Sequence, residues 1–462
     1  MGKPPVRDSL TTTSAEGKRI RIYPAEVSGR WSRRRSRVQW ALILLYVALP
    51  WIRIGGHPLL QLDIEHRRFS IFGQLFFAQE VPDLVFLTLS FMLFIGLITS
   101  WFGRAWCGWA CPQTVFIERV FRSVERLVEG NALNRKRLHE GSWSLGKILK
   151  KSIKWVAFTG IAVVLSHSFL GYFVGGEASF GMMTRSPALH PASFTWVLLF
   201  TGVVLFDFAW FREQFCLVAC PYGRFQSVMM DDSSLFIHYD RTRKDCIDCS
   251  RCVSVCPTGI DIRNGLQMEC IACTACVDAC DLVMSRIKKP QGLISYQSLR
   301  SIAGKGGFRL LRARPVIYAS MLAACLSVLA CRLSTRSPWS VEVTRAVDTP
   351  YQVLKGQDGS DWVLNHFRVH LGNRGWYDYD PSVMIGEGDR DRAELVLPPG
   401  LLQAGALHLR SGESKDFDVF LKVRKGALNE NTGGGLIALR TLWSPSKESR
   451  TELKVIGPGH DL

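Results

Sequence analysis

The sequence predicts a membrane bundle of about five α-helices, with a cysteine-rich segment at one membrane face and a small all-β domain at the C-terminal end. Three observations support this prediction. Long uncharged apolar blocks alternate with basic segments, eight cysteines are gathered in two identically spaced runs, and short alternating apolar segments follow residue 337. The chain has 462 residues, of which 47% are hydrophobic, so it is long enough to form several such parts.

The apolar blocks predict the membrane spans. Three of them are uncharged and about as long as the 20 residues that cross a ~30 Å hydrocarbon core, namely Leu84–Phe102, Trp155–Gly176 and Ser186–Phe206. Pro315–Cys331 is shorter, but arginines flank it on both sides, and their long side chains can reach the membrane interface. Val38–Ile52 has only 15 uncharged residues between two arginines, so a buried core helix is the alternative there.

The positive charges predict the orientation of these spans. Residues 1–37, 103–154 and 212–314 carry ten, eleven and fifteen Lys and Arg, whereas the loops 53–83 and 177–185 carry three and one. Cytoplasmic loops of membrane proteins are enriched in Lys and Arg, so we expect the three basic segments in the cytoplasm and the two loops outside. This distribution explains the net charge of +17, and nucleic-acid binding is therefore not expected.

These boundaries divide the chain into five parts. They are a basic cytoplasmic tail (1–37), four spans with a cytoplasmic interfacial loop at 103–154 (38–211), a cytoplasmic cysteine-rich segment (212–314), a fifth span (315–333) and an outer β domain (338–462). The tail lacks the small-residue cleavage site of a signal peptide, and it is basic enough to lie against anionic lipid.

The eight cysteines form two runs with the same spacing. The first run is Cys246, Cys249, Cys252 and Cys256, and the second is Cys270, Cys273, Cys276 and Cys280. Bacterial-type ferredoxins bind two [4Fe–4S] clusters with this spacing, and the fourth cysteine of each run ligates the other cluster. We therefore expect one cluster on Cys246, Cys249, Cys252 and Cys280, and the other on Cys270, Cys273, Cys276 and Cys256. Zinc is the alternative, but zinc sites usually use two separated cysteine pairs.

Two more cysteine pairs share the pattern C-x3-C-P. They are Cys107 with Cys111 and Cys216 with Cys220, and each pair begins within about ten residues of the predicted cytoplasmic end of a span. A residue before proline avoids the α region, and a proline often begins a helix. The second cysteine of each pair is therefore expected at a helix N-terminus, where the positive end of the helix dipole favours the thiolate. Such pairs can bind Cu(I), exchange disulfides or ligate another redox centre. The alternative is that they are small buried residues at helix contacts.

Other polar residues near the spans have simpler predicted roles. His167 lies within the third span, so it is a candidate ligand or proton relay, with a hydrogen bond to a neighbouring helix as the alternative. Asp207 and Arg212 are expected to pair at the membrane interface. Cys325 and Cys331 in the fifth span have no partner pattern and are expected to be packing residues.

The segment Val115–Glu129 alternates apolar and charged residues with a near-helical period. It predicts an amphipathic helix at the cytoplasmic membrane surface. Glu118 and Arg122 are four residues apart, so they are expected to form a surface ion pair on the charged side.

The residues after Ser337 predict a small β-sandwich. Strands are expected at Leu364–Leu371, Ala393–Leu397, Phe417–Val423 and Leu436–Leu439, separated by turns such as Gly356–Ser360 and Asn431–Gly435. The segment contains no cysteine, so neither a disulfide framework nor a thiolate metal site is expected in it. A partner-binding or structural role is expected instead.

Three long stretches of the sequence resemble the CcoG family, also called FixG or RdxA. They are GRAWCGWACPQTVFIER (103–119), REQFCLVACPYGRFQSVMMDD (212–232) and CIACTACVDACDLVMSRIKKPQGLISY (270–296). The resemblance runs from about Gly17 to Tyr296 and resumes at Gly359–Asn373, which is similar to the family's immunoglobulin-like C-terminal domain. These proteins are membrane polyferredoxin-type accessory proteins for assembly of cbb-type haem–copper oxidases.

The resemblance implies a protein of the bacterial inner membrane whose C-terminal domain is periplasmic. It further implies reduction of Cu(II) to Cu(I) for copper delivery, with oxidase subunits or copper chaperones as partners and an unidentified electron donor. Placing the copper at Cys107, Cys111, Cys216 and Cys220 is our own hypothesis.

Three functions remain compatible with the sequence: a copper-reducing electron-transfer enzyme, a conduit from membrane quinol to another acceptor, and a non-catalytic assembly scaffold. Copper stoichiometry separates the first from the second, and function that survives loss of cluster redox activity would favour the third.

Overall fold

The computed structural model describes residues 12, 19–54, 57–65, 68–72, 74–77, 81–355, 361–375, 377–398, 407–429, 434–444 and 447–458. Residues 1–11 and 13–18 of the predicted basic tail and the predicted turn at 356–360 lie outside this part of the chain. The chain forms two compact units, which are described separately. The first comprises Met1–Ile52, Pro58–Arg67 and Ala78–Arg332, and the second comprises Arg53–His57, Arg68–Phe77 and Leu333–Leu462.

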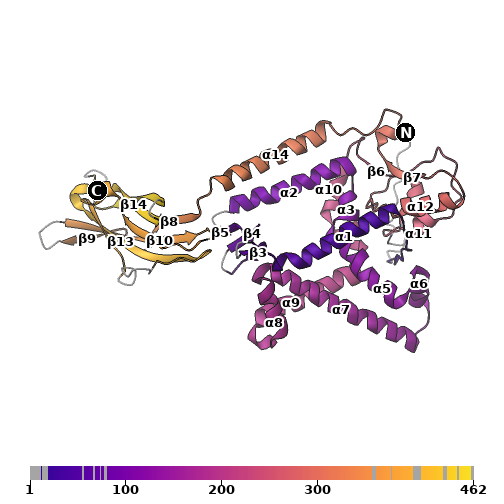
Figure 1. Cartoon of the computed structure of the whole chain (residues 1–462), viewed down its shortest axis with the longest axis horizontal. Coiled ribbons are helices and arrows are strands. Elements are labelled where there is room, and N and C mark those ends of the chain that lie inside the picture. Colours follow the sequence, from indigo (N-terminus) through magenta and orange to yellow (C-terminus); the bar gives the residue numbers. More distant parts are fainter. Residues whose placement is uncertain are drawn as a thin grey trace. The chain divides into compact units, whose positions relative to one another are not determined.

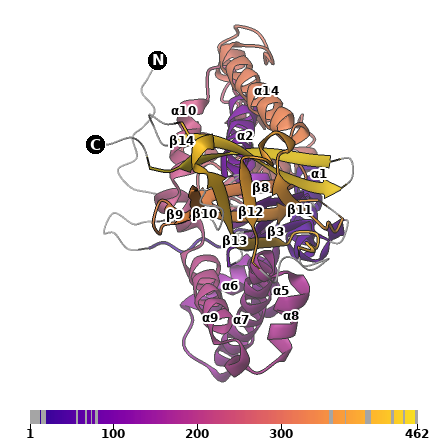
Figure 2. The same cartoon turned by 90° about the vertical axis from the view of Figure 1, so that its left-hand side faces the viewer.

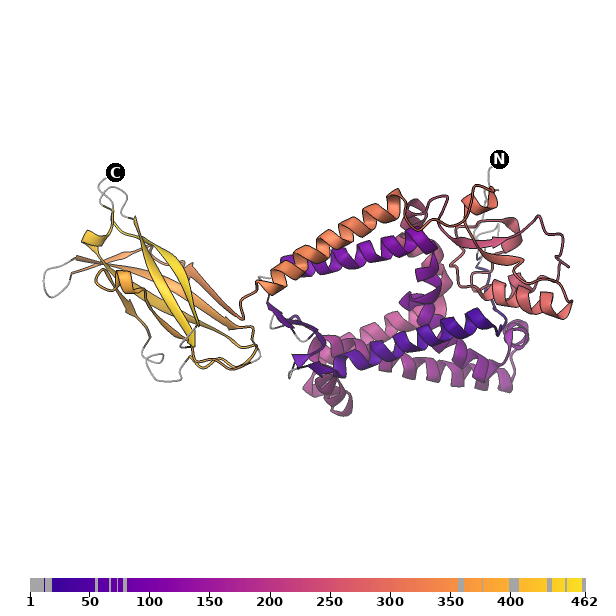
Figure 3. The same ribbon diagram turned by 45° about the horizontal axis from the view of Figure 1, so that its top comes forward.

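Within the described residues, four helices of the chain are long and apolar enough to cross a membrane. They lie in α2 (Val81–Phe102), α7 (Leu145–Val174), α9 (Pro191–Val204) with its π-helical continuation η5 (Leu205–Phe211), and α14 (Ala313–Ser334). They correspond to four of the predicted spans. α2 and α14 lie side by side in Figures 1 and 3, and Arg332 of α14 forms an ion pair with Asp83 of α2. Large apolar side chains such as Leu89, Met92 and Met321 are exposed on these helices, as lipid contact requires.

The predicted first span corresponds to α1 (Arg30–Ala48), which continues into the 3₁₀ turn η1 (Leu49–Trp51). The first eight residues of α1 include five arginines, so only its C-terminal part is apolar. Gly29 precedes α1, and the Asp278 carboxylate of a later helix accepts hydrogen bonds from the Trp31 and Ser32 backbone N–H groups. A carboxylate at a helix N-terminus stabilises the helix. A fifth span remains a prediction.

Two of the spans, α7 and α9 with η5, share an aromatic core with residues 116–124. Phe121 and Phe158 are fully buried, with ring centroids 4.9 Å apart, and Val204 of α9 and Ala209 of η5 belong to the same core. The remaining elements before residue 212 are short. They are β1 (Arg53–Ile54), β2 (His57–Pro58), β3 (Leu60–Asp63), β4 (Arg68–Ile71), β5 (Gln74–Phe77), α3 (Ala105–Trp109), α4 (Pro112–Val115), the π-helical η3 (Phe116–Phe121), α5 (Arg122–Glu129), α6 (Ala132–Glu140), α8 (Gly176–Thr184) and η4 (Pro187–Leu189).

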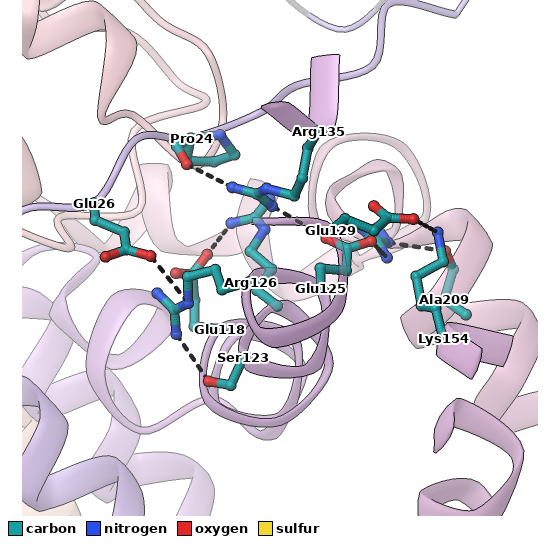
Figure 4. Close-up of polar contacts among 12 residues, drawn as sticks. Pro24, Glu26, Glu118, Ser123, Glu125, Arg126, Glu129, Arg135, Lys154 and Ala209 are labelled. Carbon is teal, nitrogen blue, oxygen red and sulfur yellow. Dashed lines mark hydrogen bonds and ion pairs between the residues drawn. The ribbon is translucent and has the colours of Figure 1, made fainter. Parts of the chain in front are cut away.

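The predicted amphipathic helix is observed as α4, η3 and α5, but its orientation differs from the prediction. Arg122, Glu125 and Glu129 are buried, whereas Leu127 is 86% exposed. The Glu118–Arg122 ion pair forms, and it is buried rather than on the surface. The charged side faces inward because oppositely charged side chains from other segments meet it there, as Figure 4 shows.

Arg212 belongs to this buried group. Its guanidinium binds Glu125 at 2.6 Å, while Asp207 accepts a hydrogen bond from Gln113 at 2.8 Å. The predicted pairing of Asp207 with Arg212 is therefore wrong. The physical reason is that Arg212, at φ 53°, closes the end of the helix and directs its side chain to α5.

The cysteine-rich segment folds between two antiparallel strands, β6 (Phe236–Tyr239) and β7 (Ile294–Gln297). A helix begins inside each cysteine run, α11 (Arg251–Ser254) in the first and α12 (Ala275–Arg286) in the second. The other elements of this region are the π-helical η6 (Phe215–Ala219), α10 (Pro221–Met229), the 3₁₀ turn η7 (Ile262–Asn264) and α13 (Leu299–Ile302). Buried isoleucines, among them Ile237, Ile260 and Ile294, form the core beside the cysteines.

The second unit contains the all-β region that the sequence predicts. Among the described residues, one sheet has the order β12 (Ala393–Val396), β13 (Ser414–Arg424), β10 (Asp361–Asn373) and β8 (Trp339–Arg345), with β9 (Gln352–Lys355) also paired to β10. The other sheet is β11 (Ser382–Ile385), β14 (Gly434–Ser444) and β15 (Lys447–Ile456), and Figure 2 shows these strands. Every second residue of β10 from Val363 to Leu371 is buried, and both sheets contribute to one core. The 3₁₀ turns η8 (Glu387–Asp389) and η10 (Lys425–Ala427) connect strands.

Candidate functional site

The eight cysteines of the two runs line two small pockets in the first unit. One pocket is lined by Cys252, Cys256, Cys270, Cys273 and Cys276, and the other by Cys246, Cys249, Cys252 and Cys280. The fourth cysteine of each run thus shares a pocket with the first three cysteines of the other run. Apolar residues such as Ile260 and Leu293 complete the walls.

The backbone of the two runs has the same unusual conformation at equivalent positions. Asp248 and Ser250 in the first run, and Ala272 and Thr274 in the second, have φ between 50° and 64°. Left-handed backbone is uncommon for residues other than glycine and is concentrated at functional sites. When left-handed residues occur at every second position, successive backbone N–H groups turn toward one side and form a concavity. Many iron–sulfur sites use such concavities. The two loops are therefore shaped alike for an anionic group.

The donor sets fit [4Fe–4S] clusters. Each of the two pockets is lined by at least four cysteines drawn from both runs, which is the number of thiolates that one [4Fe–4S] cluster needs. A zinc ion needs its ligands within about 2.0–2.3 Å of one point, whereas a cluster takes thiolates at separate corners. Burial raises the pKa of the Cys270 and Cys280 thiols to about 12, and a cationic centre bound between them would favour their thiolate forms.

The two C-x3-C-P pairs occupy equivalent positions near the ends of spans. Cys107 lies in α3 and Cys216 in η6, while Cys111 and Cys220 have extended backbone directly before the prolines that begin α4 and α10. The predicted helix starts at the two prolines are therefore confirmed. The thiols converge, because Cys111, Cys107 and Cys220 are close enough to Cys216 for their charge to raise its pKa, in addition to the larger effect of burial.

The pKa of the Cys107, Cys111 and Cys216 thiols moves upward, in the direction opposite to the prediction. Burial raises the pKa of Cys107 to about 11, although the charge of Arg104 acts the other way. Burial also raises the pKa of Cys111, although the Gln113 and Thr114 backbone N–H groups of the helix N-terminus bond to it and lower that pKa. Loss of water around a charged group outweighs the helix terminus at these positions. The prediction of a low-pKa thiolate is therefore wrong for Cys111.

A buried glutamine joins the two C-x3-C-P segments. The Cys107 Sγ donates to Gln226 Oε1 at 3.1 Å, and Arg104 Nε donates to the same oxygen at 3.1 Å. Gln226 lies in α10, five residues after Pro221, and is fully buried. Gln226 therefore holds the first pair against the helix that follows the second pair.

Gly108 brings the first pair against the loop that carries Cys270 and Cys273. A Cβ added to Gly108 would lie 2.4 Å from the Ile271 carbonyl oxygen and 2.8 Å from the Cys273 Cα. Two residues of α1 strengthen this contact. Arg35 donates to the Cys273 carbonyl at 3.0 Å, and Gln39 donates to the Gly108 carbonyl at 3.3 Å. The C-x3-C-P segment and the loop that carries Cys270 and Cys273 are thus in direct backbone contact.

We expect Gly108→Ala to weaken this contact and to lower the stability of the first unit. The added methyl group meets backbone atoms that cannot rotate away, and overpacking of this kind costs about 1–3 kcal/mol. Thermal unfolding and bound iron of the purified protein measure the effect. Gly146→Ala is the matched control, because nothing lies within 4 Å of its added Cβ. Equal behaviour of the two variants would contradict the importance of the contact.

The other candidates lie apart from these sites. His167 Nδ1 is 3.0 Å from the Val163 carbonyl of its own helix, so it bonds within α7 rather than to a neighbouring helix. Cys325 and Cys331 lie in α14, and neither is among the residues that line the two cysteine pockets. Sequence reasoning missed Gln226, Gly108 and Arg35. Gly108 had a signal, since a glycine between two cysteines allows close backbone approach, but Gln226 and Arg35 had none.

Family models for iron–sulfur proteins match two parts of the chain. A model described as a 4Fe-4S dicluster domain matches residues 211–245 and 241–299, which hold both cysteine runs. A model described as a 4Fe-4S binding domain matches residues 84–136, which hold α2 and the first C-x3-C-P pair.

Three relatives match more than half of the chain. The chain is 33% identical to protein RdxA of Cereibacter sphaeroides over 383 residues, which is 77% of this chain and 80% of RdxA. It is 33% identical to protein RdxB of the same organism over 393 residues, with 79% and 81% covered. It is 36% identical to the nitrogen fixation protein FixG of Rhizobium meliloti over 313 residues, with 62% and 59% covered. Together with the four membrane-length helices, these matches show that the chain is a membrane iron–sulfur electron-transfer protein that belongs to the CcoG family, also called FixG or RdxA.

Proposed function

We propose that this protein transfers electrons from two [4Fe–4S] clusters to Cu(II) and so supplies Cu(I) for assembly of a cbb-type haem–copper oxidase. The observation that supports this most strongly is the backbone contact at Gly108 between the Cys107–Cys111 segment and the Cys270–Cys273 loop. A metal bound at the first segment would be separated from a cluster in that loop by a few residues. Electron transfer between them needs no further carrier.

In this proposal, the fourth cysteine of each run is a ligand of the cluster that the first three cysteines of the other run hold. Cys246, Cys249, Cys252 and Cys280 hold one cluster, and Cys256, Cys270, Cys273 and Cys276 hold the other, in agreement with the two pockets. Each cluster supplies one electron at a time. The chain surrounds these ligands with apolar residues and with the Arg35 guanidinium, which donates to the Cys273 carbonyl. A positive charge beside a cluster favours its reduced form.

Copper is the substrate in this proposal, and Cys107, Cys111, Cys216 and Cys220 are its ligands. Thiolate sulfur is soft and favours Cu(I) over Cu(II). The raised pKa of the Cys107 and Cys111 thiols means that copper displaces protons as it binds. In the described residues these thiols are not already at the spacing of a single metal ion, so binding must draw them together. One electron from a reduced cluster converts Cu(II) to Cu(I), and the cluster is oxidised by one electron.

The proposed location follows the charge distribution. The clusters and the N-terminal tail face the cytoplasm of a bacterial cell, and the second unit lies in the periplasm, because the Lys and Arg residues gather in segments 1–37, 103–154 and 212–314. With α1 as a fifth span, the two ends of the chain lie on opposite sides of the inner membrane. The periplasmic β domain is then available to oxidase subunits or copper chaperones.

The test is an anaerobic one. The purified protein is reduced with dithionite, freed of excess reductant and mixed with Cu(II), while cluster absorbance and chelated Cu(I) are followed together. We expect Cu(I) to appear in step with cluster oxidation. Cys107→Ser and Cys216→Ser should slow it at least about tenfold, the scale on which metal sites respond to altered contacts, with iron content unchanged.

Cys325→Ser in α14 is the matched control and should behave like the unaltered protein. If reduced clusters do not react with Cu(II), copper reduction is refuted. If Cys107→Ser reacts at the normal rate, the proposed copper ligands are wrong.

A further inference from the structure

A pocket of about 510 Å³ lies where α1, the end of α2, α3, α12 and β7 meet. Trp31, Phe102, Trp109 and Tyr296 are among its walls. Its volume is in the range of about 300–1,000 Å³ that small-molecule sites occupy. It is distinct from the two pockets that the cluster cysteines line.

The aromatic rings form a set suited to a planar ligand. The ring centroids of Trp31 and Trp109 are 6.0 Å apart, edge to face, and those of Trp31 and Tyr296 are 5.6 Å apart. The Trp109 Nε1 is buried beside the Tyr296 hydroxyl, and it has no partner at good hydrogen-bonding geometry among the described residues. The Tyr296 hydroxyl is the neighbour of this donor, so a ligand oxygen placed between the two groups could accept a hydrogen bond from Trp109.

The pocket touches the loops of both redox sites. Trp109 lies between Cys107 and Cys111 in the first C-x3-C-P pair. The Tyr296 hydroxyl donates at 3.1 Å to the carbonyl of Ala272, which lies between Cys270 and Cys273. A molecule bound against Trp109 and Tyr296 would therefore be within a few residues of the cluster ligands.

The lining indicates which class of molecule fits. Arg30 and Asp281 are the charged members of the described lining, so it has no net positive charge to hold the phosphates of a nucleotide. Apolar residues such as Leu235, Val277 and Ile294 make up much of the remainder. Phe102 is the last residue of α2, so the pocket lies at the depth where this span leaves the apolar layer. An uncharged planar ring with oxygen substituents and an apolar tail meets these conditions.

We propose that this pocket binds the headgroup of a membrane quinol, which is the electron donor to the clusters. The proposal rests on the electron-transfer function above and names the donor. Oxidation of one quinol to the quinone releases two electrons and two protons. Each of the two clusters accepts one electron, and the protons pass to the water at this membrane face. The two-electron donor thus matches the two one-electron acceptors.

A second apolar pocket provides the comparison. It has a volume of about 720 Å³ and is lined by Phe169, Trp196 and Phe200, with Ala178 at its wall. α1 spans the distance between the two pockets, because its start binds Asp278 of α12 and the residue Pro50 after its end contacts Gly171 of α7. A helix of 19 residues is about 28 Å long at 1.5 Å per residue. A quinol in the second pocket would be too far from the clusters to reduce them directly.

The experiment combines labelling with reduction. The purified protein is illuminated with an azido derivative of decylubiquinone, and labelled peptides are identified by mass spectrometry. Separately, decylubiquinol is added anaerobically and cluster reduction is followed optically. We expect labels on peptides that contain Trp31, Trp109 or Tyr296. Ala105→Leu, which fills the pocket from α3, should reduce both labelling and the quinol-driven rate by about tenfold or more.

Two more variants make the result specific. Ser295→Leu fills the same pocket from β7 and should show the same loss, with clusters that dithionite still reduces. Ala178→Leu fills the second pocket and should leave labelling and rate unchanged. Labelling confined to the second pocket, or a normal quinol rate in Ala105→Leu and Ser295→Leu, overturns the proposal. If decylubiquinol fails but Cu(II) still oxidises dithionite-reduced clusters, the quinol site is refuted and the copper-reduction proposal stands.

Discussion

Replacing Glu125 with Ala will destabilise the first unit by about 3–5 kcal/mol, because it leaves buried arginines without their counter-charge. Arg212 makes two hydrogen bonds to the Glu125 carboxylate, at 2.6 and 3.2 Å, and Arg135 makes a third at 3.2 Å. All three side chains are at most 8% exposed. Figure 4 shows Glu125 and Arg135 within the group, together with Glu129 and Lys154. Thermal unfolding of the purified protein in detergent measures the loss.

The pH dependence of stability has a defined sign. Burial alone would raise the pKa of Glu125, but Arg212, followed by Lys154 and Arg135, holds it at about 2. A carboxylate with a lowered pKa stabilises the folded state fully above its unfolded pKa of about 4.3, and this contribution is lost as the pH falls toward 2. When the pH falls from about 4 to about 2, the free energy of unfolding of Glu125→Gln should therefore decrease less than that of the unaltered protein.

Glu140→Ala is the matched control for the charge. Glu140 pairs with Lys136 at 3.9 Å, and both side chains are about 60% exposed. Exposed pairs of this kind contribute about 0.3–0.5 kcal/mol, so little change in the melting temperature is expected. If Glu125→Ala melted at the same temperature as Glu140→Ala, the buried ion pairs would not hold α5 in place.

Replacing Cys256 with Ala will remove the cluster that the second run holds, although Cys256 belongs to the first run. The reason is its pocket, which Cys256 shares with Cys270, Cys273 and Cys276. We expect the variant to retain roughly half of the iron, with the spectrum of one [4Fe–4S] cluster lost or converted to a three-iron form. Iron analysis and low-temperature EPR of the reduced protein measure this.

Double variants test whether the runs exchange their fourth cysteines. Because Cys256 and Cys273 line the same pocket, the variant that lacks both should lose no more iron than either single variant. Cys249 lines the other pocket, so the variant that lacks Cys249 and Cys256 should lose both clusters. The opposite pattern would show that each run holds its own cluster. Cys331→Ala, in α14, should leave both clusters in place.

Features that depend on neighbours in the sequence were predictable. Four spans follow from blocks of uncharged apolar residues, since a helix in lipid needs only its own backbone hydrogen bonds and an apolar surface. The strands of the second unit follow from alternating burial, as along β10. The helix starts at Pro112 and Pro221 follow from the fixed φ of proline. The spacing of the eight cysteines predicted an iron–sulfur protein, and the family models agree.

Only the tertiary structure decided the surroundings of these elements. The charged side of α5 faces inward because Arg135, Lys154 and Arg212 meet it from three other segments, and no local pattern reveals such partners. The thiols of Cys107 and Cys111 have raised rather than lowered pKa values because the folded chain removes water from them. Local conformation depends on adjacent residues, and the sequence by itself determined it. Burial, ion pairing and the meeting of the C-x3-C-P segment with the loop of Cys270 and Cys273 depend on residues that are far apart in the sequence, 249 positions in the case of Asp83 and Arg332, and folding alone brings these together.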